Sequence, residues 1–340
     1  MKFLRGIAVL VGLGALLAAA PVSAGPTLDR VHSRGSVICG INPVLGFAAF
    51  QPDGRWAGFL VDFCRAIAAA VLGDAERIEI IGVESANRFS ALKSGAIDVL
   101  VDGATWTLGR ETEFRFVFPV VYLYDGQGFL AHKDLNARTL KEAGAASVCV
   151  ITDTTSIANL EDYLGSHPLP LKLLPVQSNE GGWSAFLKRR CDIMTNDLSG
   201  LIVRRALHSP NPDDYVLLED VISKEPLGPA LRADDPAWIG IIRWVVLAMI
   251  AAEEKGIGQA LATSQAVGRD PEARALVGLG DDHGKALGME PGWARRIVQQ
   301  VGNYGEVFDR HLGKDSPLKL DRGLNRLCTQ GGLHYAPPFK

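Results

Sequence analysis

Apolar strands and amphipathic helices alternate through the first part of this chain, and this alternation limits the folds that it can adopt. Residues 36–42 form an apolar run, and residues 59–72 then carry a large apolar residue at every fourth position. This spacing predicts a strand followed by an amphipathic helix. A second strand over 77–83, a second helix over 86–94 and a third strand from Ile97 follow. Such an alternation predicts a parallel sheet with helices on its faces.

The alternation returns in the middle of the chain and predicts a second sheet of similar layout. Its expected elements are strands over 147–151, 171–176 and 191–197 and helices over 157–164 and 182–188. Residues 221–231 are rich in Pro and Gly, as is typical of a crossover between two lobes. Beyond it the pattern predicts helices alone, over 238–254, 271–277, 293–302 and 304–311. We therefore expect an α/β chain of two lobes whose last part returns to cover the first lobe.

The N-terminal residues 1–24 have the pattern of a secretory signal peptide. Lys2 and Arg5 precede the apolar run 7–20, and Val22-Ser23-Ala24 forms a small-x-small cleavage site. The apolar run is shorter than the roughly 18 to 20 residues that span a membrane, and no cysteine follows it to carry a lipid. The apolar residues 238–252 are also short and are typical of a buried helix. We expect a soluble exported protein that begins near Gly25.

The net charge and the cysteines narrow the class of function. The net charge is −3, so no basic surface indicates nucleic-acid binding. Cysteines in an exported chain favour disulfides, and we expect Cys39 to pair with Cys64 and Cys149 with Cys191, which leaves Cys328 free. The alternative is that some of them are buried and stay reduced. Because CxxC spacing is absent and the histidines are scattered, neither a metal nor a cofactor is expected.

Three loops of the first sheet are expected to converge on one site. They span 42–47, 84–88 and 103–110, and each follows the carboxyl end of a strand, where parallel sheets bind ligands. In the third loop, Thr105 and backbone N–H groups can donate to one carboxylate oxygen while the guanidinium of Arg110 binds both oxygens. The alternative is that Arg110 is an ordinary surface arginine between a strand and a helix.

The second sheet offers the opposite charge. Its third strand ends at Asp197, and its first strand runs into a loop that contains Thr155. Across a cleft from Arg110, Asp197 would accept the α-ammonium group of a free amino acid while Arg110 and Thr105 hold its α-carboxylate, with Thr155 assisting. Charge-assisted hydrogen bonds of this kind are worth about 1.5 to 3 kcal/mol each. The alternative is that Asp197 caps the helix that follows it.

Longer motifs along the mature chain carry a family resemblance. They are Cys-Gly-Ile-Asn (39–42), Gly-Phe-x-Val-Asp-Phe-Cys (58–64), Arg-Phe-x-Ala-Leu-x-Ser-Gly-x-Ile-Asp-Val-Leu (88–100), Thr-Trp-Thr-x-x-Arg (105–110), Tyr-Asp-Gly-Gln-Gly-Phe (124–129), Cys-Asp-x-x-Thr-x-Asp (191–197), Ile-Ser-Lys-Glu-Pro-Leu-Gly-Pro (222–229), Val-Gly-Asn-Tyr-Gly-Glu-x-Phe (301–308) and Tyr-Ala-Pro-Pro (335–338). With these motifs the chain resembles the periplasmic general L-amino-acid-binding proteins of ABC transporters, in solute-binding protein family 3.

The resemblance implies a type II periplasmic binding protein fold, with two βα lobes that close on one amino acid around two hinge strands, 127–133 and 224–231. It divides the mature chain into a first lobe (25–130), a second lobe (131–228) and a return to the first lobe with a C-terminal helical extension (229–340). It assigns the ligand carboxylate to Arg110 and the amine to Asp197. The implied partners are a free L-amino acid, an inner-membrane permease and its ATPase, and the protein is expected to be a monomer.

Several residues depart from the family pattern, and these departures affect which ligand the site is expected to prefer. Relatives usually carry a serine or asparagine where this chain has Gly103 and a threonine where it has Ala104, so one side-chain donor is missing. Asp153 stands where a glycine commonly precedes the Thr-Thr pair, and it adds negative charge near the expected carboxylate site. The loop from Asn42 to Phe47 is one residue shorter than usual, which affects the stacking of Phe47 on a ligand.

Arg88 has two interpretations. It either reaches an acidic side chain of the ligand or braces the helix over 86–94. We favour the brace, because arginines pair structurally more often than they select ligands.

These observations favour a non-catalytic binding protein that delivers polar amino acids to a permease. The first alternative is a periplasmic dehydratase of the cyclohexadienyl type on the same scaffold, with Asp153, Glu84 or Asp102 as the general acid. The sequence shows no paired nucleophile and base in its favour. The second alternative is a ligand sensor for a signalling receptor, which would use the same site.

Overall fold

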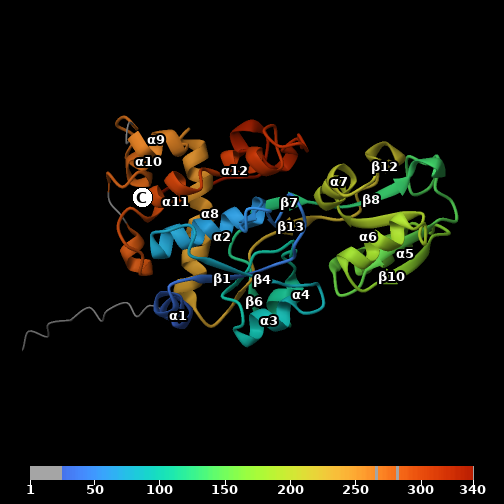
Figure 1. Ribbon diagram of the computed structural model, residues 1–340, viewed down its shortest axis with the longest axis horizontal. Coiled ribbons are helices and arrows are strands. Elements are labelled where there is room, and N and C mark those ends of the chain that lie inside the picture. Colours follow the sequence, from blue (N-terminus) through green and yellow to red (C-terminus); the bar gives the residue numbers. More distant parts are fainter. Residues whose placement is uncertain (1–24, 265–266, 281–282, 340) are drawn as a thin grey trace, which may run out of the picture.

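Two α/β lobes and a layer of C-terminal helices make up the chain (Figure 1). The structure is a computed structural model and describes residues 25–264, 267–280 and 283–339. The expected signal peptide, residues 1–24, lies outside the described residues. In Figure 1 the second lobe lies at one end of the molecule, the first-lobe sheet in the middle and the C-terminal helices at the other end. The predicted two-lobed α/β architecture is confirmed.

The first lobe is built on a three-stranded parallel sheet of order β4-β1-β5. Its strands are β1 (Val37–Ile41), β4 (Ile78–Gly82) and β5 (Val99–Leu100), and its helices are α1 (Pro26–Arg34), α2 (Phe59–Leu72), α3 (Arg88–Ser94) and α4 (Leu108–Thr112). A short hairpin, β2 (Ala49–Phe50) and β3 (Trp56–Ala57), connects β1 to α2. The predicted strands and helices of this lobe are confirmed, because their apolar periodicity is a local property of the sequence.

Gly58 allows the loop over 42–47 to pack closely against the start of α2. A Cβ atom at this position would lie 2.3 Å from the carbonyl oxygen of Phe47, and the residue has φ of +141°, so only glycine fits without strain. The close approach lets the first turn of α2 donate to the loop, from the Phe59 N–H to Gly46 O (3.1 Å) and from the Leu60 N–H to Phe47 O (2.9 Å). The loop over 42–47 is thereby held at the carboxyl end of β1.

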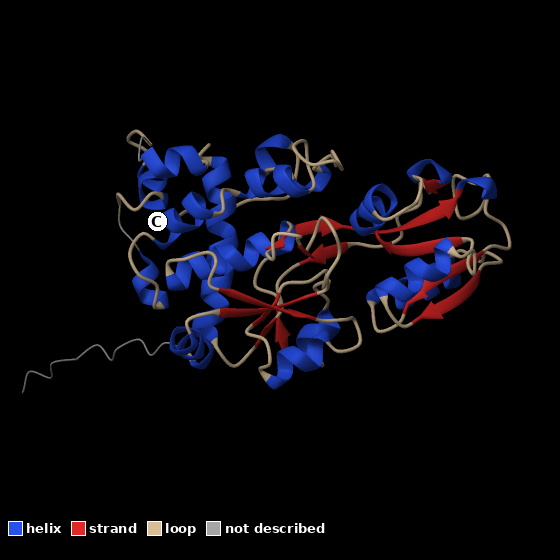
Figure 2. Cartoon of the chain, in the orientation of Figure 1, coloured by secondary structure: helices blue, strands red, loops and turns tan. Residues whose placement is uncertain are grey.

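The second lobe is a five-stranded sheet of order β10-β9-β11-β8-β12, in which β8 runs antiparallel to its neighbours. Its strands are β8 (Gln127–His132), β9 (Ser147–Ile151), β10 (Lys172–Val176), β11 (Ile193–Asp197) and β12 (Tyr215–Leu217), and its helices are α5 (Thr155–Ser166), α6 (Asn179–Leu187) and α7 (Leu198–Leu207). Figure 2 shows that helices pack along this sheet and also along the sheet of the first lobe.

The predicted first hinge strand, 127–133, is wrong. These residues form β8, which lies inside the second sheet between β11 and β12. All six residues of β8 are buried, and a fully buried strand needs neighbours that a two-stranded connection cannot provide. The lobes are instead joined by the antiparallel pair β7 (Leu123–Asp125) and β13 (Glu225–Leu227). The second predicted hinge segment, 224–231, contains β13.

The C-terminal part returns to the first lobe, as predicted, and supplies about half of the buried hydrophobic residues described in its core. Its helices are α8 (Pro236–Glu254), α9 (Gln259–Ser264), α10 (Pro271–Leu276), α11 (Trp293–Gln300) and α12 (Tyr304–His311). The strand β14 (Leu231–Arg232) pairs with β6 (Phe116–Val117). Helix α8 is long and apolar enough to cross a membrane, but its apolar residues are buried against α2, α11 and α12. It is therefore a core helix.

The C-terminal extension also holds the connection between the lobes. The side chain of Asn325 donates to Tyr124 O (2.9 Å) and accepts from the Tyr124 N–H (2.7 Å). The Tyr304 hydroxyl donates to Tyr122 O (2.8 Å), just before β7. These bonds satisfy backbone groups of the connection that would otherwise lack partners.

Both predicted disulfides are present. Cys39 of β1 is bonded to Cys64 of α2, and Cys149 of β9 is bonded to Cys191, just before β11. Each bond ties elements within one lobe, across 25 and 42 residues of sequence. Bonds that close loops of this length typically stabilise a fold by about 2 to 4 kcal/mol. Cys328 is free and exposed, as predicted.

Candidate functional site

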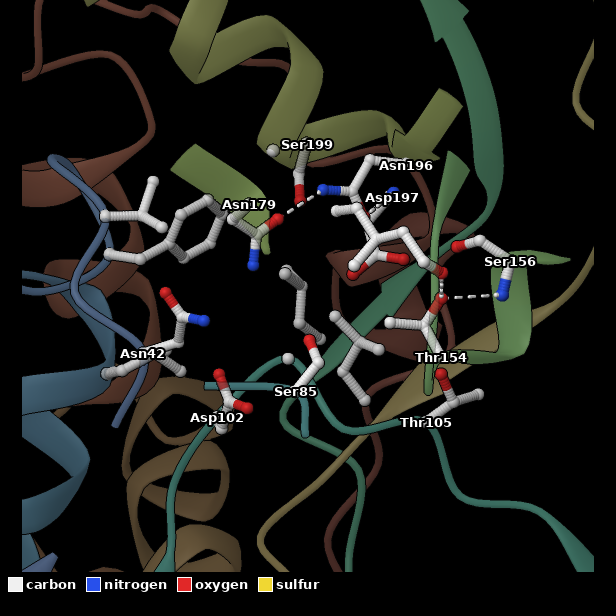
Figure 3. Close-up of a pocket in the computed structure, with 18 of the residues that line it drawn as sticks. Asn42, Ser85, Asp102, Thr105, Thr154, Ser156, Asn179, Asn196, Asp197 and Ser199 are labelled. Carbon is white, nitrogen blue, oxygen red and sulfur yellow. Dashed lines mark hydrogen bonds between the residues drawn. The ribbon is translucent and has the colours of Figure 1, made fainter. Parts of the chain in front are cut away.

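A cavity lies between the two lobes, where the carboxyl ends of their strands face one another (Figure 3). The space between its side chains measures about 820 Å³, including the open solvent at its mouth. The first lobe contributes residues from all three loops that the sequence predicted to converge: Asn42, Val44, Phe47, Ser85, Arg88, Gly103 and Thr105. The second lobe contributes Thr154, Thr155, Ser156, Asn179, Asn196, Asp197, Ser199, Gly200 and Arg204. The predicted convergence of the loops is confirmed.

Arg88 is braced by a buried ion pair in the first-lobe wall. Its Nη1 lies 2.8 Å from Oδ2 of Asp102, and both side chains are about 6% exposed. The favoured interpretation of Arg88 as a brace therefore fits the structure, although the residue also lines the cavity. Asn42, beside it in the wall, donates from Nδ2 to Oε2 of Glu84 (3.3 Å).

Thr105 links the two lobes through a buried carboxylate. Its hydroxyl donates to Glu225 of β13, and its oxygen lies 3.3 Å from the hydroxyl oxygen of Thr155 on α5. Glu225 also accepts from Asn159 Nδ2 (2.8 Å) and Ser223 Oγ (2.7 Å). Thr105 and Thr155 both line the cavity, as predicted, and both point a hydroxyl at Glu225 on the connecting strand.

Arg110 is buried beside the cavity rather than in its wall. Its Nη1 donates to the carbonyl oxygen of Thr105 (2.5 Å), and its guanidinium lies 5.0 Å from the ring centre of Phe89. Among the described residues, no carboxylate lies within ion-pair distance of it. Burial, and then the charge of Arg88, lowers the pKa of Arg110 to about 10. Arg110 is thus a buried cation with no ion-pair partner in the described part of the chain.

Asp197 lies in the second-lobe wall and faces the first lobe. It occupies the N-cap position of α7, but its side chain makes no capping hydrogen bond, so the alternative role as a helix cap does not fit. A Cβ atom added to Gly103 would lie 3.4 Å from Oδ2 of Asp197, which shows how closely the two lobes approach. The small residue at 103 therefore leaves the Asp197 carboxylate open to the cavity.

The carboxyl groups of Asp125, Asp197 and Glu225 lie close enough together to repel one another. Asp125 and Glu225 are directly opposite one another in the β7–β13 pair. Burial raises the pKa of Asp125 to about 6, although Asp125 accepts hydrogen bonds from Ser199 and from the Gly126 N–H. Burial, and then the charges of Asp125 and Glu225, raises the pKa of Asp197. A cation in the cavity would relieve this repulsion.

Asp153 does not lie where the sequence placed it. Its side chain is exposed, and it is not among the residues that line the cavity. The backbone has φ of +58° at this position, where it turns from β9 towards α5 and brings Thr154 to Ser156 to the wall instead. A left-handed turn suits glycine, which is the residue that the family resemblance led us to expect at this position. The predicted effect of Asp153 on ligand preference therefore loses its structural basis.

Several wall residues were missed in the sequence. Ser85 lies in a loop that was predicted to converge, and Asn196 adjoins Asp197, so both carried a local signal. Asn179 and Arg204 had no such signal. Asn179 begins α6 and Arg204 lies within α7, and both helices have an ordinary sequence pattern. Phe47 lines the cavity and packs edge-on against Phe59, with ring centres 6.3 Å apart.

Comparisons with known proteins agree with this geometry. The family model of the bacterial extracellular solute-binding proteins, family 3, matches residues 37–257. The chain is 41% identical to the general L-amino acid-binding periplasmic protein AapJ of Rhizobium johnstonii, over 98% of each chain. It is 44% identical to the glutamate/glutamine/aspartate/asparagine-binding protein BztA of Rhodobacter capsulatus, over 97% of each chain.

A solved structure is also similar to this chain. It is an ABC transporter/periplasmic binding protein from Brucella ovis with glutathione bound, and it is 38% identical with a TM-score of 0.89. The similarity covers 92% of this chain and 99% of that one. Both lobes and the C-terminal helices therefore have counterparts in one solved protein.

Proposed function

Because this chain belongs to family 3 of the bacterial extracellular solute-binding proteins, we propose that it is the periplasmic binding component of an ABC importer for L-amino acids. The proposal includes export, with cleavage of the signal peptide near Ala24, and delivery of the ligand to an inner-membrane permease that works with an ATPase. Relatives of nearly the same length that are named as amino-acid-binding proteins support it.

One observation supports the amino-acid ligand most directly. The Asp197 carboxylate from the second lobe is open to the cavity, close to the Gly103–Thr105 loop of the first lobe. Behind that loop lies Arg110, which is a cation without an anionic partner among the described residues. A free amino acid carries the two charges that this arrangement lacks. Its α-ammonium would pair with Asp197, and its α-carboxylate with Arg110, which would keep its bond to Thr105 O while the rest of the guanidinium turns to the ligand.

A ligand held in this way bridges the two lobes. It binds the closed arrangement better than an open one, so it shifts the equilibrium towards closure, and the permease would recognise the closed shape. The short β7–β13 pair is the connection about which the lobes would move.

We propose that the protein binds and does not convert its ligand. Of the carboxyl groups considered as a general acid, Asp102 is engaged by Arg88 and Asp153 is exposed outside the cavity wall. Glu84 accepts a hydrogen bond from Asn42 and does not line the cavity. A sensor for a signalling receptor would use the same ligand site, and transport of a labelled ligand by the intact importer separates the two roles.

A ligand screen by thermal unfolding tests the proposal. The mature protein is unfolded and refolded to remove any bound ligand, and its Tm is measured with each common L-amino acid and with glutathione. A ligand at a hundredfold excess over its Kd stabilises the folded state by about 2.7 kcal/mol, which raises the Tm by several degrees. We expect increases with several polar amino acids. The absence of an increase with every amino acid would contradict the proposal.

The raised pKa values of Asp125 and Asp197 predict that amino-acid binding weakens in acid. The ligand's ammonium would pair with ionised Asp197, and its positive charge would also disfavour the protonated form of Asp125, whose pKa burial raises to about 6, so binding releases protons. Affinity for L-glutamine should therefore fall several-fold between pH 7.5 and pH 5.5. Calorimetry in buffers of different ionisation enthalpy measures the released protons.

The unliganded protein should show the opposite trend in stability. A folded-state pKa above the unfolded value stabilises the fold at low pH, and this stabilisation is lost as the pH rises through about 6 for Asp125. Asp125→Asn should reduce both pH dependences. An affinity for L-glutamine that is equal at the two pH values would show that the ligand's ammonium does not change the protonation of Asp125 or Asp197.

A further inference from the structure

Arg204 places a buried positive charge in the second-lobe wall, at a distance from Asp197. Both residues line the cavity, and so does Gly200 between them. Positions i, i+3 and i+7 share one face of a helix, and seven residues at 1.5 Å each separate Asp197 from Arg204 by about 10 Å along α7. Long side chains on a helix lean towards its N-terminus. The Arg204 side chain therefore leans from its own turn towards the turn of Asp197.

The hydrogen bonding of Arg204 is incomplete. Its side chain is 1% exposed, and its Nη2 donates to Oε1 of Glu180 at 2.9 Å. Its guanidinium lies 5.7 Å from the ring centre of Trp183. Its Nη1 is buried and has no hydrogen-bond acceptor among the described residues. Buried donors are almost always satisfied, so an acceptor that the protein does not supply is expected here.

The charge of Arg204 is also less compensated than that of Arg88 across the cavity. Arg88 is paired with Asp102, and both of these side chains are buried. The carboxylate that pairs with Arg204 belongs to Glu180, which is 65% exposed and is screened by water. The second-lobe wall also carries the amides of Asn179 and Asn196, and Asn196 Nδ2 donates to Asn179 Oδ1 at 3.0 Å. Among the described residues, Arg204 therefore has no buried carboxylate to balance its charge.

We propose that Arg204 binds a carboxylate at the far end of the ligand, so that the site favours ligands with a second carboxylate over neutral ligands of the same length. The inference rests on the proposed function, because it takes Asp197 as the anchor of the α-ammonium group. A carboxylate accepts from a guanidinium in a charge-assisted hydrogen bond, whereas a neutral amide of the same shape does not provide the charge. The second carboxylate can belong to an acidic amino acid or to the end of a short peptide.

Two ligand pairs distinguish these sources in titrations by isothermal calorimetry. L-glutamate and L-glutamine differ at the side chain, and glutathione and its glycine monoethyl ester differ at the peptide end. The wild-type protein should bind the charged member of at least one pair at least tenfold more tightly. Arg204→Gln should reduce that preference about tenfold or more while leaving the neutral member within a few-fold. The pair that loses its preference identifies the source of the carboxylate.

Other outcomes overturn the inference and are distinct from failure of the proposed function. Equal weakening of charged and neutral ligands by Arg204→Gln would show that Arg204 only packs against Trp183 and Glu180. A wild-type protein that binds the neutral members as tightly as the charged ones would also overturn it, while amino-acid binding itself would stand. A wild-type protein that binds no amino acid would refute the proposed function.

Two further variants keep the test decisive. Arg205→Gln removes the neighbouring arginine, which does not line the cavity and donates from Nε to Pro212 O, so the preference should remain. Glu180→Gln removes the exposed carboxylate partner of Arg204 and keeps Arg204 itself, so the preference for the charged ligand should be kept or increased. If Arg204→Gln does not fold, a loss of preference in Glu180→Gln would overturn the inference.

Discussion

Arg110→Ala is expected to weaken the binding of every amino acid by a similar factor, about a thousandfold. The variant removes the cation that would bind the α-carboxylate, a group that all amino acids share, so the order of preference should not change. Two charge-assisted hydrogen bonds at about 1.5 to 3 kcal/mol each account for a loss of this size. Titration calorimetry with ligands of different side chains measures it.

The position of Arg110 beside the wall makes this experiment informative. Arg110 donates to Thr105 O and is buried, so its loss could also disturb the loop over 103–110. Arg110→Lys keeps the positive charge and should retain part of the affinity, because an ammonium group lacks the planar two-pronged geometry. Arg115→Ala is the control, since Arg115 is exposed near the end of α4. Unchanged affinities in Arg110→Ala would exclude it as the carboxylate ligand.

Asp197→Asn is expected to lower the affinity for amino acids by about a hundredfold or more and to leave the unliganded fold intact. The amide keeps the shape of the side chain and removes the charge that pairs with the ammonium group. Truncation of one member of a desolvated charge pair costs about 2 to 5 kcal/mol. Because burial, Asp125 and Glu225 all disfavour the ionised form of Asp197, the unliganded variant should melt at the same temperature as the wild-type protein or higher.

The combination of lost binding and kept stability separates a ligand contact from a structural role. Asp213→Asn is the control, since Asp213 is exposed outside the cavity wall. A ligand analogue without the amine, such as glutarate, should bind the wild-type protein weakly and should lose little further affinity in Asp197→Asn. If Asp197→Asn lowered the affinities for glutarate and L-glutamate equally, Asp197 would not be the residue that binds the ligand's amine.

The opposite charges of the predicted site arise on two separate chain segments. Each was found from a local pattern: a strand that ends in small and hydroxyl residues before Arg110, and a strand that ends at Asp197. The structure brings Asp197 close to Gly103, from the other lobe. It also shows that Thr105 is bonded to Glu225, 120 residues away, which no local pattern indicated.

Asp153 and β8 show where local patterns fail. Asp153 follows a strand, as ligand residues often do, but a single left-handed backbone angle puts its side chain in solvent. Residues 127–132 form an extended segment between two lobes, which is equally compatible with a hinge and with a central strand. The second sheet supplies partners on both sides of this segment, and those partners lie far away in the sequence.

The sequence by itself determined the alternation of strands and helices, the disulfide pairs and the loops that meet at the cavity. The strands and helices depend on apolar periodicity and turn residues, which are properties of neighbouring residues. The order of these elements along the chain then places each cysteine pair, and the three loops, within a single lobe. Only the tertiary structure decided that Arg110 lies behind the wall, that Asp125 and Glu225 face one another, and that Arg204 lacks a full set of partners. Burial and charge pairing depend on groups that folding brings together from distant segments, so no local pattern can encode them.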